Sequence, residues 1–494
     1  MPRVQASFRD PSGYVFDREG HILRAINAEF RSVWDELCQK GFIAKLTSER
    51  SLVRTSLVAD PLRAALAAEH PGFESFLEHE RIQPITYPYE WSTSMLADAG
   101  IHTLDLQMRL LEGGYSLKDA SAYNIQFVEG RPVFIDLTSI ERPQRLDLWF
   151  ALGQFQRMFL FPLLLHRYRG WDLRSYFLPS LDGRNLEQVR QSLGRRALWR
   201  PSLLLDVTLP LLLERRENKR QAAHPHMVGR DASPRRPNGG SGEPSLPGPA
   251  GASPARPAPT GGSSQAQVFT LKRLRGKVAK LTAALQPRSE WTGYTETCTY
   301  DQTAENAKKA LVREFLLTRR PEQVLDLGCN QGDYSFIAAE CGARVLAADS
   351  DPQVIEQLYR RLRQNPRPIS PVVQDLGNPS PAIGFRNEER TRFLDRAQCD
   401  CLLALALVHH LLVSANLPLE GIRDLFCDLT RSHAVVEFVP TNDPMFQRLL
   451  KFRVNLFEGL TLEAFRSVFS QRFEILEQAA IPNSPRTLFF LRKR

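Results

Sequence analysis

The stretch from Val324 to Ser335 constrains the fold of this chain more than any other. Its apolar run, Val-Leu-Asp-Leu, ends at Gly328, a second glycine follows at Gly332, and an amphipathic segment begins at Phe336. That order is typical of a buried strand, a tight turn and the start of a helix. Glycines in such a turn let backbone N–H groups approach a ligand closely where a Cβ would block them.

A second apolar run, residues 343–348, ends in the acid Asp349. A carboxylate about 20 residues beyond a glycine-rich turn is placed to bind the hydroxyl pair of a ribose. The unit therefore predicts a nucleoside-binding βαβ. The dinucleotide pattern G-x-G-x-x-G is absent, and no Gly-Lys-Ser/Thr follows, so the turn is not a phosphate-cradling loop.

With Asp326 before its first glycine, the turn resembles motif I of class I S-adenosylmethionine (SAM)-dependent methyltransferases. Further segments match the later strands of that family in order: 372–376, 399–407 ending at His409 and His410, 434–439, and a terminal antiparallel pair at 473–476 and 486–491. The resemblance covers residues 288–494. It implies an α/β fold whose Rossmann-like, seven-stranded sheet carries helices on both faces.

The resemblance also implies the cofactor, SAM, and the residues that hold it. One group surrounds the methionine part and the ribose: Asp326, Gly328, Asn330 and Gly332. Asp349 matches the acid that binds the ribose hydroxyls, and Asp375 with Leu376 matches the position near the adenine.

The acceptor side has three candidate residues. His409 and His410 match the end of the fourth strand, and Glu437 lies at the end of the fifth. A histidine there can take a proton from a hydroxyl, since its ordinary pKa is about 6.5; equally, one of the pair can cap a helix or fill the sheet edge. The Asn/Asp-Pro-Pro-Tyr motif of amino-group methyltransferases is absent, which favours an oxygen, carboxyl or carbon acceptor.

A segment rich in Pro, Gly, Ser and Arg divides the 494-residue chain. It predicts a disordered linker over 217–267, because such a composition buries too little apolar surface to offset its ordering entropy. The predicted domains are 1–216 and 268–494, and a short basic helix over 269–285 leads into the second. Residues 217–286 hold eleven Lys and Arg against three Asp and Glu, so most of the net charge of +9 lies there.

The charge distribution and composition narrow the partners and the compartment. Because the two halves outside the linker are nearly neutral, a metabolite, glycan or lipid-linked acceptor is favoured over nucleic acid. No run of 18 uncharged apolar residues and no signal peptide is found, so we expect no membrane span and a cytoplasmic protein. Seven cysteines without C-x-x-C spacing favour free thiols over a disulfide framework or a zinc site.

The N-terminal half predicts an α+β domain: a hairpin over 14–26, a helix over 91–111 and a second hairpin over 117–139. Asp119, Asn124 and Asp136 follow that helix at spacings of five and twelve residues. The pattern resembles the core of protein-kinase-like and aminoglycoside-phosphotransferase-like folds. It implies that Asp119 orients an acceptor hydroxyl while Asn124 and Asp136 bind Mg²⁺ with ATP, if the module is active.

The N-terminal half also departs from that pattern. No glycine-rich loop precedes the helix, and no Val-Ala-Ile-Lys strand supplies a phosphate-pairing lysine. Three interpretations stay open: a degenerate kinase-like module that binds a partner or substrate, an active small-molecule kinase, and an unrelated αβ domain. For the whole chain, the alternatives to a methyltransferase are a bifunctional kinase–methyltransferase and a non-catalytic SAM-binding scaffold.

The whole arrangement resembles a bacterial family of two-part SAM-dependent methyltransferases that includes nodulation proteins of the NoeA type. The segments that carry this resemblance are 87–91, 117–124, 134–137, 407–411 and 437–439. It implies a bacterial source and names no acceptor.

Overall fold

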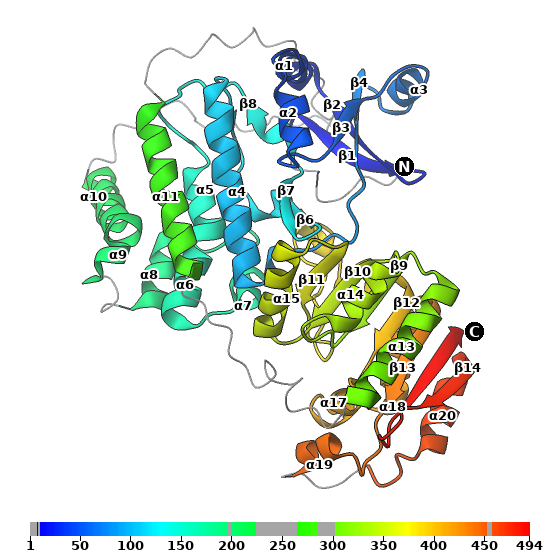
Figure 1. Ribbon diagram of the computed structural model, residues 1–494. Coiled ribbons are helices and arrows are strands. Elements are labelled where there is room, and N and C mark those ends of the chain that lie inside the picture. The colour runs from blue at the N-terminus through cyan, green and yellow to red at the C-terminus, as the bar shows by residue number, and fades with distance from the viewer. Residues whose placement is uncertain (1–6, 8–9, 195–198, 224–263, 284–301, 452–456) are drawn as a thin grey trace, which may run out of the picture.

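The computed structural model describes residues 7, 10–194, 199–223, 264–283, 302–451 and 457–494. An N-terminal part, drawn blue to green, lies beside a C-terminal part that ends in red (Figure 1). Most of the predicted linker, 217–267, falls outside the described residues. No helix in the described ranges is both long enough and apolar enough to cross a membrane.

The N-terminal part begins with an antiparallel sheet of order β1-β2-β4-β3. Its strands are β1 (Gly13–Arg18), β2 (His21–Ile26), β3 (Thr55–Leu57) and β4 (Ser75–His79). The predicted first hairpin is confirmed as β1 and β2. Helices α1 (Ala28–Gln39), α2 (Phe42–Ser48) and α3 (Leu62–Glu69) join the strands. Strand pairing places Val15 opposite Arg24 and Ile22 opposite His79, so these four side chains share one face of the sheet.

A mostly helical region follows. The predicted helix is confirmed as α4 (Thr93–Glu112), which begins after Ser92, whose side chain accepts the Met95 N–H. The second hairpin is confirmed as β6 (Ile125–Val128) and β7 (Arg131–Phe134). The other elements are β5 (Ser116–Leu117), β8 (Ile140–Glu141), α5 (Leu152–Phe155), α6 (Phe161–Arg169), α7 (Leu173–Phe177), α8 (Leu186–Leu193), α9 (Pro201–Leu203) and α10 (Leu209–Ala223).

Helix α11 (Gln265–Ala283) belongs to the N-terminal core, although the sequence assigns it to the start of the second domain. It lies against α4 and α6 (Figure 1). Leu271, Leu274 and Val278 are fully buried in the N-terminal hydrophobic cluster. The helical spacing of these apolar residues predicts the helix correctly, but spacing cannot tell which of two apolar surfaces the helix will cover.

The C-terminal part is built on a seven-stranded sheet of order β11-β10-β9-β12-β13-β15-β14. The first five strands are parallel and β15 runs antiparallel to both its neighbours. This order and direction confirm the Rossmann-like, seven-stranded sheet. The strands are β9 (Gln323–Leu327), β10 (Arg344–Asp349), β11 (Ile369–Val373), β12 (Cys399–Ala404), β13 (Thr430–Phe438), β14 (Phe473–Ala480) and β15 (Thr487–Lys493).

Helices cover both faces of this sheet because side chains alternate along each strand. On β9, Leu325 and Leu327 belong to one hydrophobic cluster and Val324 to the other. One face is covered by α16 (Phe393–Arg396), α17 (Val408–Val413), α18 (Leu419–Leu429), α19 (Pro444–Leu450) and α20 (Leu462–Ser470). The opposite face is covered by α13 (Gln302–Arg319), α14 (Asp333–Glu340) and α15 (Pro352–Gln364).

Two strand ends differ from the prediction. Strand β11 ends at Val373, so Asp375 and Leu376 lie in the loop that follows it. Strand β12 ends at Ala404, and Ala406 has φ of +51°, which turns the chain out of the strand. His409 and His410 therefore lie in the short helix α17 and not at the end of a strand.

Candidate functional site

The glycine turn after β9 requires residues without a Cβ. Gly328 has φ of +68°, and its N–H donates to the Ala348 carbonyl at 2.8 Å. Gly332 has φ of +85°, and an added Cβ would lie 2.5 Å from Leu358 Cδ1. Both glycines thus hold the turn close against β10 and α15, with the N-terminus of α14 directly behind it.

Asp349 is fixed at the end of β10 by two backbone donors. Its Oδ2 accepts the Asn330 N–H and its Oδ1 accepts the Asp351 N–H, both at 3.0 Å. Burial raises the pKa of Asp349 above its ordinary value. The buried Asn330 Oδ1 has no hydrogen-bond partner among the described residues. An oriented carboxylate beside an unsatisfied amide oxygen suits a ligand that donates hydroxyl or amino hydrogens.

Asp326 lies beneath the turn and not on its surface. Its side chain is 2% exposed, and its Oδ2 accepts the Ser335 hydroxyl at 2.6 Å. Burial raises the pKa of Asp326 to about 6. The Ser335 hydroxyl lies in the first turn of α14, so Asp326 ties the strand to the helix and shapes the turn from below.

The loop after β11 carries Asp375 and Leu376 to the same edge of the sheet. The Gln374 N–H donates to the Asp349 carbonyl at 2.7 Å, and Asp375 Oδ1 accepts the Gly377 N–H at 2.8 Å. Because β10 and β11 are parallel, their carboxyl ends meet at one edge. The structure therefore brings the predicted cofactor residues together there.

The two histidines of α17 lie in different surroundings. His409 is 1% exposed, its ring lies 6.0 Å from that of Phe446, and neither ring nitrogen has a hydrogen-bond partner among the described residues. Burial lowers the pKa of His409 well below its ordinary value. His410 is half-buried, and burial together with nearby Arg486 lowers its pKa to about 4. Both rings are therefore neutral at pH 7.

Glu437 belongs to a buried ion-pair network. Its side chain is fully buried and lies 2.5 Å from Lys308 Nζ and 3.3 Å from Arg486 Nη1. Its Oε2 also accepts the Ala406 N–H at 2.8 Å. These contacts hold the turn that leads from β12 into α17, so Glu437 supports the histidines from beneath.

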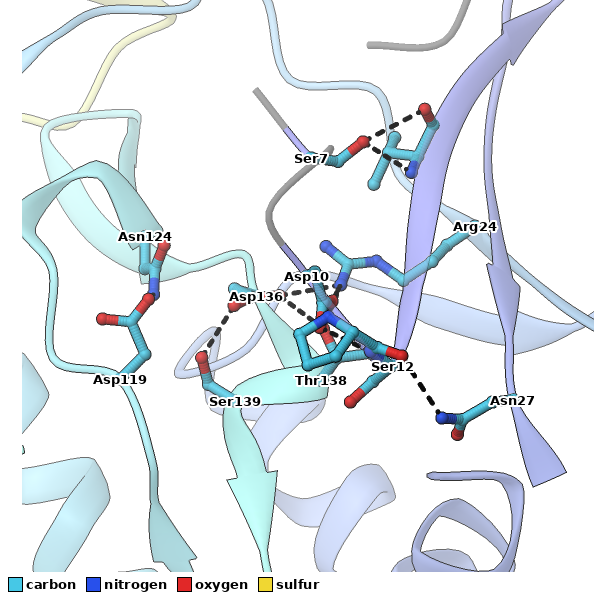
Figure 2. A network of polar contacts seen from close by, with 12 residues as sticks. Ser7, Asp10, Ser12, Arg24, Asn27, Asp119, Asn124, Asp136, Thr138 and Ser139 are labelled. Atoms are coloured by element: carbon cyan, nitrogen blue, oxygen red, sulfur yellow. Dashed lines mark hydrogen bonds and ion pairs between the residues drawn. The ribbon is translucent and has the colours of Figure 1, made fainter. Parts of the chain in front are cut away.

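In the N-terminal part, Asp119, Asn124 and Asp136 all line one cavity, and Figure 2 shows them near the polar network around Arg24. Asn124 Nδ2 donates to Asp119 Oδ2 at 3.1 Å. Burial, with Asp136 nearby, raises the pKa of Asp119. Asn124 and Asp119 are thus joined directly, and Asp136 lies at the wall of the same cavity.

Both oxygens of Asp136 are engaged by protein groups. Its Oδ1 accepts from Arg24 Nη1 at 2.8 Å and its Oδ2 from the Ser139 hydroxyl at 2.7 Å. Arg24 also contacts Asp10 at 3.1 Å (Figure 2). Burial alone would raise the pKa of Asp136, but Arg24 and the hydroxyls of Ser139 and Thr138 hold it below its ordinary value. Within the described ranges, no three His, Cys, Asp or Glu side chains are grouped to hold a metal ion.

A cavity of about 1090 Å³ lies between this network and the C-terminal sheet. The sheet contributes the amino ends of its strands, through Val324, Arg344 and Cys399. The predicted cofactor residues lie at the carboxyl ends of the same strands. The cavity is therefore a separate site, roughly 15–20 Å away, which is the length of a five- to six-residue strand.

Comparison with known proteins identifies the family. No protein-family model matches the chain. The chain is 32% identical over 492 residues to the nodulation protein NoeA of Rhizobium meliloti (strain 1021), covering 99% of this chain and 95% of that protein. The chain belongs to the NoeA family.

Two solved structures are similar to part of this NoeA-family chain. The N-methyltransferase NodS from Bradyrhizobium japonicum WM9 is 14% identical, covers 39% of this chain and 98% of its own, and has a TM-score of 0.30. The bifunctional kinase-methyltransferase WbdD is 16% identical, covers 44% of this chain and 45% of its own, and has a TM-score of 0.29.

Sequence reasoning missed several residues that shape the sites of this NoeA-family member. Arg24 lies 112 positions from Asp136, and Lys308 and Arg486 both meet Glu437 from distant segments. No local motif marks any of them. One signal in the sequence could have pointed to Arg24. It lies in an alternating strand, and a charged side chain on the buried face of a strand needs a partner of opposite charge.

Proposed function

We propose that this chain transfers a methyl group from SAM to an oxygen or carboxyl acceptor of a metabolite, glycan or lipid-linked substrate. The observation that carries the proposal is Asp349, held by two backbone N–H groups beside the glycine turn and next to the unsatisfied Asn330 oxygen. When bound, SAM supplies an activated methyl group on a sulfonium sulfur. The chain's task is then to position the reactants and to remove a proton where the acceptor carries one.

The cofactor residues have distinct roles in this proposal. Asp349 accepts the two ribose hydroxyls through the lone pairs that its backbone contacts leave free. Gly328 and Gly332 provide backbone approach to the methionine part, and Asn330 Oδ1 accepts a ligand hydrogen. Asp375 and Leu376 lie at the adenine side, where the loop leaves Asp375 exposed.

His410 is the proposed base for a hydroxyl acceptor. Its neutral imidazole would take the hydroxyl proton as the acceptor oxygen bonds to the methyl carbon, while the bond from that carbon to sulfur breaks and its electron pair stays on sulfur. His409 is less suited because it is packed fully between neighbouring rings. Glu437 is committed to Lys308 and Arg486, so its proposed part is to hold α17 in place.

We propose further that the N-terminal part is a kinase-like module that binds a ligand without a divalent metal. The Arg24 guanidinium already occupies the carboxylate that the kinase pattern reserves for Mg²⁺. His79 Nδ1 bonds to Thr55 Oγ1, whose hydroxyl donates to the Val53 carbonyl, so His79 Nε2 is an unprotonated acceptor. That atom is buried at the cavity wall without a partner among the described residues, which suits a hydroxyl-bearing ligand.

The alternative function is a bifunctional kinase–methyltransferase that uses Mg²⁺ and ATP. The grouping of Asp119, Asn124 and Asp136 favours it, and the engagement of both Asp136 oxygens disfavours it. Steady ATP hydrolysis by the full chain in Mg²⁺, abolished in Asp119→Asn, would establish this alternative.

Calorimetric titration of SAM into the full-length chain tests the main proposal. We expect micromolar binding that Asp349→Ala weakens tenfold or more, which corresponds to about 1.4 kcal/mol or more. Asp35→Ala is the matched control, since this half-exposed aspartate pairs with Arg31 of the same helix, α1, in the N-terminal part. Absence of SAM binding by the wild-type chain would refute the proposal. If SAM binds as expected, comparison of metabolites between a deletion strain and its parent would identify the acceptor.

A further inference from the structure

The N-terminal part contacts the C-terminal part at several places, and two of these places each follow a predicted cofactor carboxylate. Helix α15 begins at Pro352, three residues after Asp349, and packs against α4. The loop that carries Asp375 runs on to Ser380 and meets α7. Both elements whose placement sets the cofactor site therefore have partners outside their own domain.

At the second place, Arg174 of α7 holds the loop through two hydrogen bonds. Its Nη2 donates to the Asn378 carbonyl at 2.6 Å and its Nη1 to the Ser380 hydroxyl at 3.1 Å. The Ser380 hydroxyl donates in turn to Gln374 Oε1 at 3.1 Å, and Gln374 Nε2 donates to the Asp375 carbonyl at 3.0 Å. An unbroken series of hydrogen bonds thus runs from Arg174 to the backbone of Asp375.

Residues 374–380 have no helix or strand of their own to fix this path. Ser380 is 1% exposed and Gln374 is 2% exposed, so water cannot readily replace the contacts that they make. From the N-terminal part, Arg174 contacts this loop at two points, the Asn378 carbonyl and the Ser380 hydroxyl. Without the guanidinium, the loop loses two of the bonds that select its conformation.

At the first place, α15 is set into the N-terminal core. Glu356 is 5% exposed and accepts the Ser94 N–H at 3.0 Å as well as the Ser94 hydroxyl. Tyr359 is fully buried, belongs to the N-terminal hydrophobic cluster, and donates its hydroxyl to Asp98 at 2.7 Å. Separating the two parts would expose this apolar surface and remove partners from Glu356 and Tyr359.

We propose that the N-terminal part completes the cofactor site, with Arg174 as a positioning residue for the loop that presents Asp375 and Leu376. This inference rests on the proposed SAM binding. Arg174 acts through the loop: it raises the fraction of molecules whose loop is already in the binding conformation. Since an apparent Kd equals the intrinsic Kd divided by that fraction, a fall of the fraction from near one to about one tenth weakens binding about tenfold.

The experiment measures the Kd of SAM for the full-length wild type and for Arg174→Ala. We expect Arg174→Ala to weaken SAM binding about five- to twentyfold. Any fall in the thermal unfolding midpoint should be too small to account for that weakening. Ser380→Ala breaks the same series of bonds from the other side and should weaken binding in the same direction. Arg275→Ala is the matched control, because it removes an arginine whose ion pair with Asp105 lies within the N-terminal part.

A double-variant cycle distinguishes positioning from general destabilisation. If Arg174 acts through the loop, Arg174→Ala in an Asp375→Ala background should add less than twofold to the Kd. Fully additive effects, or an Arg174→Ala Kd within twofold of wild type, would overturn the inference while SAM binding by the wild type stands. A wild-type chain that binds no SAM would instead refute the proposed function, and the inference with it.

Discussion

Arg396 makes the most deeply buried ion pair between the two parts, and its removal gives the sharpest test of their interface. Its guanidinium contacts Glu90, with side chains 7% and 0% exposed. It also donates to the Ile85 carbonyl at 2.5 Å and the Thr391 carbonyl at 3.1 Å. Its centre lies 4.4 Å from the ring centroid of Tyr87. Arg396→Met keeps much of the volume but leaves the Glu90 carboxylate buried without its cation.

The expected cost follows from that uncompensated charge. Removing one partner of a buried ion pair costs about 3–5 kcal/mol, chiefly because the other charge stays out of water. Glu90 keeps the hydrogen bond from the Tyr87 N–H at 3.1 Å, which favours the lower half of that range. The double variant Glu90→Gln/Arg396→Met has no buried charge left, so it should be more stable than Arg396→Met by about 1 kcal/mol or more.

Urea unfolding followed by tryptophan fluorescence measures these differences. Because the two parts need not unfold together, the first transition is the one to compare. Arg392→Met is the matched control in the same segment: its pair with Asp395 is 58% and 52% exposed, so its loss should cost under about 1 kcal/mol. A loss for Arg396→Met as small as that for Arg392→Met would refute the reasoning.

Three further predictions concern the sites themselves. Gly332→Ala should weaken SAM binding and destabilise the chain more than Gly342→Ala, because both have positive φ but only the Cβ at 332 would collide with Leu358; equal effects in calorimetry and urea unfolding would contradict this. Burial raises the pKa of Asp326 to about 6, above its unfolded value of about 3.9. The native state then binds more protons than the unfolded state between these values, so the free energy of unfolding of wild type minus that of Asp326→Asn should fall as pH rises from about 4 to about 6. A difference that rises with pH over this range would contradict a raised pKa of Asp326 in the native state. Finally, Mn²⁺ titration followed by electron paramagnetic resonance should show no tight site at Asp136 while Arg24 is present; tight binding lost in Asp136→Asn would restore the metal-dependent kinase interpretation.

Much of the cofactor-side structure of the C-terminal part, from β9 to β10, was predictable because its signals are local. The glycine turn, the acid that ends β10 and the alternation of the strands all arise within about 25 consecutive residues. Positive φ at Gly328 and Gly332 and the buried strand before them follow from backbone sterics and apolar patterning. The predicted end of the fourth strand was wrong, because Ala406 turns the chain out of β12 and His409 and His410 lie in the helix α17.

The N-terminal half shows the limit of local reasoning. The spacing of Asp119, Asn124 and Asp136 resembles a kinase-like pattern, and the structure joins Asn124 to Asp119 with Asp136 at the wall of the same cavity. The spacing does not predict that Arg24, on a strand far earlier in the chain, pairs with Asp136. The same holds for α11, whose helical spacing is clear in the sequence while its place against α4 is not.

The sequence by itself indicated individual elements such as β9, β10 and α4, because backbone preference and apolar periodicity act over a few turns or one strand. The seven-stranded sheet was implied by the family resemblance. Only the tertiary structure decided how the parts meet. Glu90 reaches Arg396 across 306 positions, Ser94 reaches Glu356 across 262, and Arg174 reaches Ser380 across 206. Such pairs form because burial excludes water from two particular surfaces at once, and no stretch of sequence records which surface will face which.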